Sequence, residues 1–162
     1  LLTDQGASTV FIGGSFTLMA APLVFLSVRF GRLVDRKGSV LIASFGILAI
    51  APAVVSYGWL NAPLALGAAG IIHAVGSSAI SPAAAALVAE GSPPDMIARG
   101  QGLLEAVGFL AAAAFALPTG WAYETIGRAT WFTGISAASL ALFATGWWLA
   151  RRQHAPNTPF WR

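Results

Sequence analysis

The sequence predicts an all-α fold, an integral membrane helical bundle with five transmembrane helices, and three observations favour that class. The composition is 57% hydrophobic and only 9% charged, whereas ordinary soluble domains carry about 25% charge. Uncharged runs long enough to cross a bilayer alternate with short polar segments. The basic residues gather beside these runs, as they do in loops next to lipid.

The uncharged runs place the five spans in order along the chain. A helix rises about 1.5 Å per residue and needs about 20 residues to cross the hydrocarbon core. The uncharged run 39–89 is long enough for two crossings, and the Gly, Asn and Pro residues between 58 and 63 provide the turn between them. The predicted spans are residues 9–28, 39–57, 63–89, 97–119 and 129–150, which make residues 1–150 one transmembrane domain, followed by a polar tail at 151–162.

The basic residues predict how the chain is oriented. Of its nine lysines and arginines, all but Arg128 fall in the segments 29–38 and 90–99 or in the tail. Cytoplasmic loops carry this excess of positive charge. We therefore expect a multi-pass protein of the cell membrane whose first partner is the lipid bilayer. We also expect the amino terminus of this segment to lie outside and the tail to be cytoplasmic.

Several kinds of function lack the residues they would need. The chain has no cysteine, its two histidines are too far apart in sequence for a metal site, and no phosphate-binding glycine loop is present. We expect no cofactor, no metal and no enzymatic activity. Nucleic acid is also an unsuitable partner, because the net charge is only +3 and the basic residues lie beside apolar runs.

One polar segment carries a motif. Gly31, Leu33, Asp35, Arg36 and Gly38 match the spacing G-x-L-x-D-R-x-G, which resembles the cytoplasmic loop signature of the major facilitator superfamily. In that family the signature follows the second helix and returns in weaker form after the eighth. The usual basic pair after the last glycine is missing here, so the stretch is similar to the weaker copy.

The resemblance implies a partial major facilitator fold, namely helices eight to twelve of a twelve-helix secondary transporter whose amino-terminal half precedes Leu1. Such a protein moves a small-molecule substrate by alternating access, and proton-coupled efflux is one of the family's functions. Segment 120–127 also resembles the outer loop before the last helix. The alternative is a small five-span structural or accessory membrane protein without transport activity.

The same resemblance gives the segment a role in gating. We expect a gating loop formed by Gly31, Asp35, Arg36 and Gly38, in which the two glycines permit the sharp turn. Asp35 would brace the gate through a neighbouring arginine or through the amino-terminal end of the span that begins near Ile97. The other interpretation is that the segment is a solvated topology signal.

Four polar side chains inside the spans are candidates for substrate binding or proton coupling. A charged group at the centre of a bilayer costs about 2.5–3.5 kcal/mol or more, so its presence requires an explanation. Glu105 is such a group, and an ion pair with an arginine of segment 29–38 is the alternative to proton coupling. His73, Ser77 and Ser81 share one helix face at spacings of four residues. A hydrogen bond to another helix is the alternative for His73.

Overall fold

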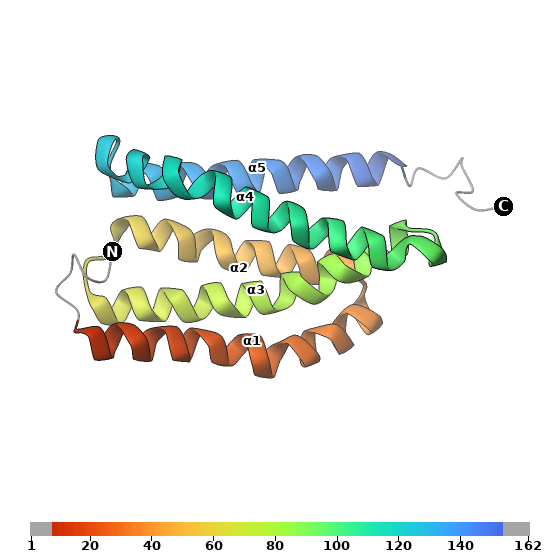
Figure 1. Cartoon of the computed structure of the whole chain (residues 1–162), viewed down its shortest axis with the longest axis horizontal. Helices are drawn as coiled ribbons and strands as arrows, with labels where there is room; N and C mark the ends of the chain where they lie inside the picture. Colours follow the sequence, from red (N-terminus) through yellow and green to blue (C-terminus); the bar gives the residue numbers. More distant parts are fainter. Residues whose placement is uncertain (1–7, 154–162) are drawn as a thin grey trace.

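The computed structural model describes residues 8–153 of the chain and is all-helical over that range. Helical residues make up nearly all of the described part, and no strand occurs in it. The all-α prediction is therefore confirmed. The helices are α1 (Thr9–Lys37), α2 (Ser39–Trp59), α3 (Pro63–Gly91), the short 3-10 helix η1 (Pro94–Met96), α4 (Ile97–Thr125) and α5 (Arg128–Gln153) (Figure 1).

Four of these helical segments are long and apolar enough to cross a membrane. They are α1, α2, α3 and the segment formed by η1 and α4. Helix α5 is not among these four over the residues that the structure describes. The helices are compatible with a multi-pass membrane protein, and a fifth crossing by α5 stays a prediction. Residues 154–162 of the predicted tail lie outside the described range.

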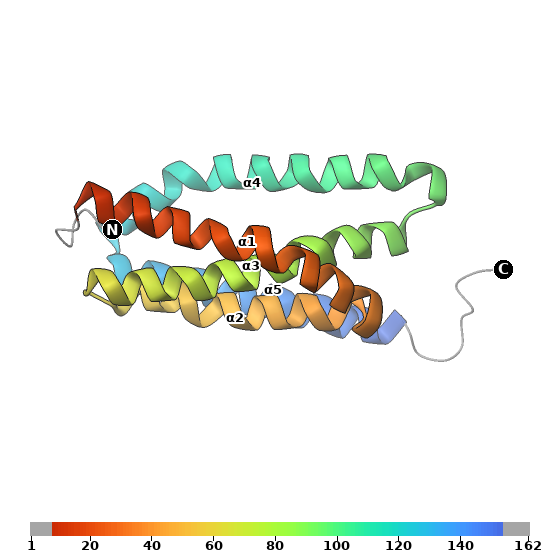
Figure 2. The same ribbon diagram turned by 90° about the horizontal axis from the view of Figure 1, so that it is seen from below.

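The five long helices run alternately up and down, so their ends form two opposite groups (Figure 1). Helix α3 packs against both α1 and α2, and α2 packs on its other side against α5. Figure 2 shows α4 standing apart from the layer that the other helices form. The carboxyl end of α1 and the amino end of α4, which carry most of the described arginines, lie at the same end of the bundle.

The charged segment after the first span is helical, contrary to the loop that the sequence predicts. Helix α1 continues through Arg36 and Lys37, and Gly31 lies inside it with no atom near the place of its missing Cβ. Only Gly38, with φ +91° and ψ 146°, breaks the helix. The expectation that Gly31 helps to make the turn was wrong, because arginine, leucine and lysine all favour continued helix and one glycine is enough to end it.

The expected outer loop is shortened for the same reason. Residues 120–125 belong to the last turns of α4, and the chain reverses at Ile126 and Gly127. Gly127 has φ +85°. Two residues therefore separate α4 from α5, where the predicted spans leave a loop of nine residues, 120–128.

The two glycines of the motif should respond to alanine in opposite directions. Gly38→Ala places a side chain in a backbone region that only glycine adopts readily, and should lower the unfolding free energy by on the order of 1–3 kcal/mol. Gly31→Ala enters open space in a helix and should raise it by up to about 1 kcal/mol. Thermal denaturation in lipid nanodiscs, followed by circular dichroism, measures both changes. Equal melting temperatures for the two variants would contradict the assignment of the turn to Gly38.

Small residues allow α2 and α3 to cross closely. A Cβ added at Gly46 would lie 2.7 Å from the carbonyl oxygen of Gly76, and a Cβ added at Gly76 would lie 2.7 Å from the carbonyl oxygen of Gly46. The two backbones therefore touch at this point. In lipid, such close approach is a main source of attraction between helices.

Hydrogen bonds join α2 to α5. The buried hydroxyl of Ser136 donates to the carbonyl oxygen of Ala51 at 2.9 Å. Toward the end of the bundle, the indole nitrogen of Trp59 donates to the hydroxyl of Thr133 at 3.2 Å. Apolar surface alone gives little preference for one pairing of helices over another in lipid, so these directed contacts help to set the position of α5.

Candidate functional site

A cavity between α3 and α4 brings together three of the side chains that the sequence singles out. Its volume is about 320 Å³, and it opens widely to the outside of the molecule. Ser77 and Ser81 of α3 line one side, and Glu105 of α4 lines the other. The remaining lining is apolar and consists of Ile50, Ile80, Ala84 and Leu104.

The geometry of α3 explains why the two serines share this cavity. Residues four apart lie one above the other on a helix face, so Ser77 and Ser81 point the same way. Ser78, one position further round the helix, faces the core and is fully buried. Ser81 and Ser77 are roughly 15 and 21 Å along the axis from the end of α3 at Gly91, so the cavity lies about midway along this helix.

The hydroxyls of Ser77 and Ser81 differ from most other helical hydroxyls of the chain. Serine and threonine side chains in helices commonly donate to the carbonyl four residues earlier. Within the described range, Ser77 and Ser81 make no such bond, and their hydroxyls face the cavity. The side chains that do make it are Ser15, Thr17, Ser27, Ser44, Ser56, Ser78, Thr125 and Thr145.

Glu105 contributes the only ionisable group among the described residues of the lining. It lies on the third turn of α4, which is exposed along nearly its whole length. The ion pair that the sequence offers as an alternative is not formed, because neither Arg29 nor Arg32 approaches the carboxylate within the described part of the chain. The helix that carries these arginines packs on α3 and α2, away from α4.

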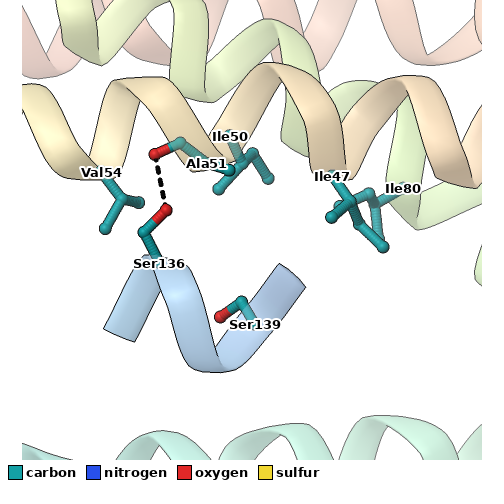
Figure 3. Close-up of a pocket in the computed structure, with 7 residues that line it drawn as sticks. All are labelled: Ile47, Ile50, Ala51, Val54, Ile80, Ser136 and Ser139. Carbon is teal, nitrogen blue, oxygen red and sulfur yellow. Dashed lines mark hydrogen bonds between the residues drawn. The ribbon is translucent and has the colours of Figure 1, made fainter. Parts of the chain in front are cut away.

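A second cavity, of about 210 Å³, adjoins the first along the same face of α2 and α3. Ile50 and Ile80 belong to both linings. Figure 3 shows Ile47, Ile50 and Ile80 directed into this second space, with the hydroxyl of Ser136 bonded to the carbonyl of Ala51 at its edge. Ser136 and Ser139 of α5 also line the second cavity, but no ionisable residue does, so the ionisable group of the region lies on the α3–α4 side.

His73 does not join the serines at the cavity, although it shares their helix face in the sequence pattern. Its imidazole Nδ1 lies 3.3 Å from the hydroxyl oxygen of Tyr57 on α2, with the two rings stacked at 5.8 Å. Phe132 of α5 packs edge-on against Tyr57 at 5.9 Å. This is the interhelical hydrogen bond that the sequence offers as the alternative for His73, and it links three helices.

The residues of the expected gating loop lie at the end of the bundle. Asp35 and Arg36 are exposed on the last turns of α1, and Asp35 forms no ion pair within the described part. Val34, the residue before Asp35, points the other way and is buried in the cluster that contains Ile42 and Ala79. A different carboxylate makes a contact at this end, since Glu90 of α3 accepts a 2.9 Å hydrogen bond from the hydroxyl of Ser39 on α2.

Comparison of the chain with protein-family models, with curated proteins and with solved structures gives no match. The resemblance of segment 31–38 to the major facilitator signature therefore rests on those residues alone.

Sequence reasoning missed the apolar part of the site. Ile50, Ile80 and Leu104 carry no chemical signal that separates a cavity wall from ordinary core or lipid-facing surface. It also missed Tyr57 as the partner of His73. The only signal available was the position of both residues near the same end of adjacent antiparallel helices.

Proposed function

We propose that this chain is the carboxyl-terminal part of a secondary transporter of the major facilitator type, which moves a small solute across the membrane by alternating access. Proton-coupled efflux is the form of transport that we would test first. The cavity between α3 and α4 is the observation that carries the proposal. It combines a carboxylate, two unbonded hydroxyls and an apolar wall inside helices of membrane-spanning length.

The cost of that carboxylate in lipid supports a functional role. An ionisable side chain within a spanning helix faces a cavity or a partner almost without exception, and marks a substrate or ion pathway. Glu105 faces a cavity and has no cation beside it in the described structure. Transporters of this kind bind substrate near the middle of the bilayer, between two halves that rock against each other. An amino-terminal half of the same protein would supply the other wall.

Transport assays on the natural protein that contains this chain would test the proposal. Cells or inverted vesicles would be loaded with two fluorescent dyes of opposite charge, ethidium and carboxyfluorescein. We expect proton-driven export of at least one dye, abolished by an uncoupler. Export no faster than in cells lacking the protein would favour the five-span accessory protein instead.

Asp35→Asn should reduce the rate of that export while leaving the amount of protein in the membrane unchanged. The neutral side chain has nearly the same shape but can no longer attract a cation or a helix amino terminus when the gate closes. A loss of about tenfold corresponds to about 1.4 kcal/mol of lost interaction. Asp95→Asn, in the exposed helix η1 at the same end of the bundle, is the matched control. Export by Asp35→Asn at the rate of this control would remove the gating role.

A further inference from the structure

We infer that the α3–α4 cavity recognises an organic cation, in which a protonated amine is attached to a compact hydrocarbon body. This inference deepens the transport function proposed above and rests on it. Charge, hydrogen-bonding capacity and the apolar wall each constrain the ligand.

The charge of the cavity selects a cation. Glu105 is the one ionisable residue in the described lining, and no lysine or arginine lines the space. Glu105 is exposed in the described chain, but under the proposed function α4 lies in the bilayer, where a carboxylate without an opposite charge beside it is costly. A neutral ligand would leave Glu105 unpaired, and an anion would be repelled by it. A positive group beside the carboxylate is the arrangement that satisfies it.

The two serine hydroxyls favour a cation that can donate hydrogen bonds. Ser77 is half-buried and Ser81 is exposed, and neither hydroxyl has a hydrogen-bond partner in the described part of the chain, so both can bond to a ligand in the cavity. Each hydroxyl oxygen can accept a hydrogen bond from an ammonium N–H. Together with the carboxylate, they provide three acceptors for the one to three N–H donors of a protonated amine.

The rest of the lining fits hydrocarbon better than a bare metal ion. Ile50, Ile80 and Leu104 present only aliphatic carbon to the space. A divalent cation such as Ca²⁺ takes six to eight oxygen ligands, and the described residues contain no cluster of acidic or histidine side chains that could hold a metal. The volume of about 320 Å³ lies at the lower end of the range for small-molecule sites. The ligand is therefore compact, about the size of a single aromatic ring with an aminoalkyl group.

Binding of matched probes to the protein in nanodiscs of neutral phosphatidylcholine tests the inference without a membrane gradient. Benzyltrimethylammonium and neopentylbenzene have the same shape and differ by one positive charge. We expect the cation to bind at least about tenfold more tightly than its neutral counterpart, after subtraction of empty nanodiscs. Protonated N,N-dimethylbenzylamine should bind more tightly still, because it offers an N–H to the serines.

Two sets of variants assign this selectivity to the cavity. Glu105→Gln should reduce the affinity for benzyltrimethylammonium by about tenfold or more. Glu124→Gln, on the exposed far end of the same helix α4, should leave it unchanged. The double change Ser77→Ala with Ser81→Ala should weaken the protonated tertiary amine more than the quaternary cation, which has no N–H to lose.

Three outcomes would overturn the inference. They are equal affinity of the unaltered protein for the cation and neopentylbenzene, equal affinities of the Glu105→Gln and Glu124→Gln variants, or tighter binding of Na⁺ alone in competition with the amines. The first comparison uses the unaltered protein, so it decides the question even if Glu105→Gln does not fold. Export of carboxyfluorescein with no cation binding would leave the transport proposal in place and remove only this inference.

Discussion

Gly46→Ala and Gly76→Ala should each destabilise the protein strongly. The new methyl group at Gly46 would lie 2.6 Å from Cγ1 of Ile80 as well as 2.7 Å from a backbone oxygen of α3. Backbone cannot rotate away as a side chain can, so α2 and α3 must separate. Overpacking costs about 1–3 kcal/mol, which exceeds the gain of up to about 1 kcal/mol from replacing glycine in a helix.

Thermal unfolding in nanodiscs measures this effect, and Gly67→Ala is the matched control on α3. A Cβ at Gly67 would meet its nearest neighbour, the hydroxyl of Ser15, at an ordinary 3.8 Å. The double variant at Gly46 and Gly76 should be destabilised by less than the sum of the two single variants, because helices that the first methyl group has pushed apart have room for the second. Melting of either single variant at the temperature of Gly67→Ala would show that the helices do not cross at these glycines.

Arg128→Met should release the amino-terminal end of α5 from α2. The Nε of Arg128 donates to the carbonyl oxygen of Gly58 at 3.1 Å, and Nη2 donates to the side-chain oxygen of Asn61. Gly58 lies in the last turn of α2, where the helix dipole favours a positive charge. Losing a hydrogen bond from a charged group costs about 1.5–3 kcal/mol, and losing the interaction with the dipole adds about 0.3–1 kcal/mol.

The same substitution at Arg99 is the control, because that side chain is exposed in the first turn of α4. The melting temperature of Arg128→Lys should lie between those of Arg128→Met and Arg99→Met, since lysine keeps the charge but lacks the planar guanidinium group that reaches both acceptors. The measurement is the melting temperature in nanodiscs, supported by accessibility of a cysteine introduced at Ala129, whose backbone packs on Gly58. Equal melting of Arg128→Met and Arg99→Met would show that this contact contributes nothing.

The helix boundaries show how accurately the local sequence predicts where each helix begins and ends. The beginnings of α2, α3 and α4 agree with the predicted spans, because Gly38, Pro63 and the polar segment after Gly91 mark them locally. The ends were less accurate where charged residues follow an apolar run. There the sequence shows where the apolar run stops, but the helix continues past that point, as α1 does for nine residues beyond Val28.

The sequence predicted the polar residues of the candidate site, but it did not predict which of them lie together. Glu105, Ser77 and Ser81 were conspicuous because polar groups are costly in lipid, and the structure places them around one cavity. His73 has the same sequence signal but turns to Tyr57 on α2. Helical spacing defines a face only to within a broad sector. His73 therefore contacts α2 while Ser77 and Ser81 face α4, although the three residues form one continuous stripe in the sequence.

The sequence by itself determined the helical class, the number of long helices and the residues that are expensive to place in a membrane. These follow from composition and from uncharged length, which are properties of each segment alone. Only the tertiary structure decided that α2 and α3 touch at Gly46 and Gly76, that Arg128 holds the end of α2, and that α4 presents Glu105 to the serines of α3. The physical reason is that apolar helices in lipid gain little from one pairing over another by hydrophobicity. Steric fit and a few directed hydrogen bonds choose the neighbours, and both depend on residues far apart in the chain.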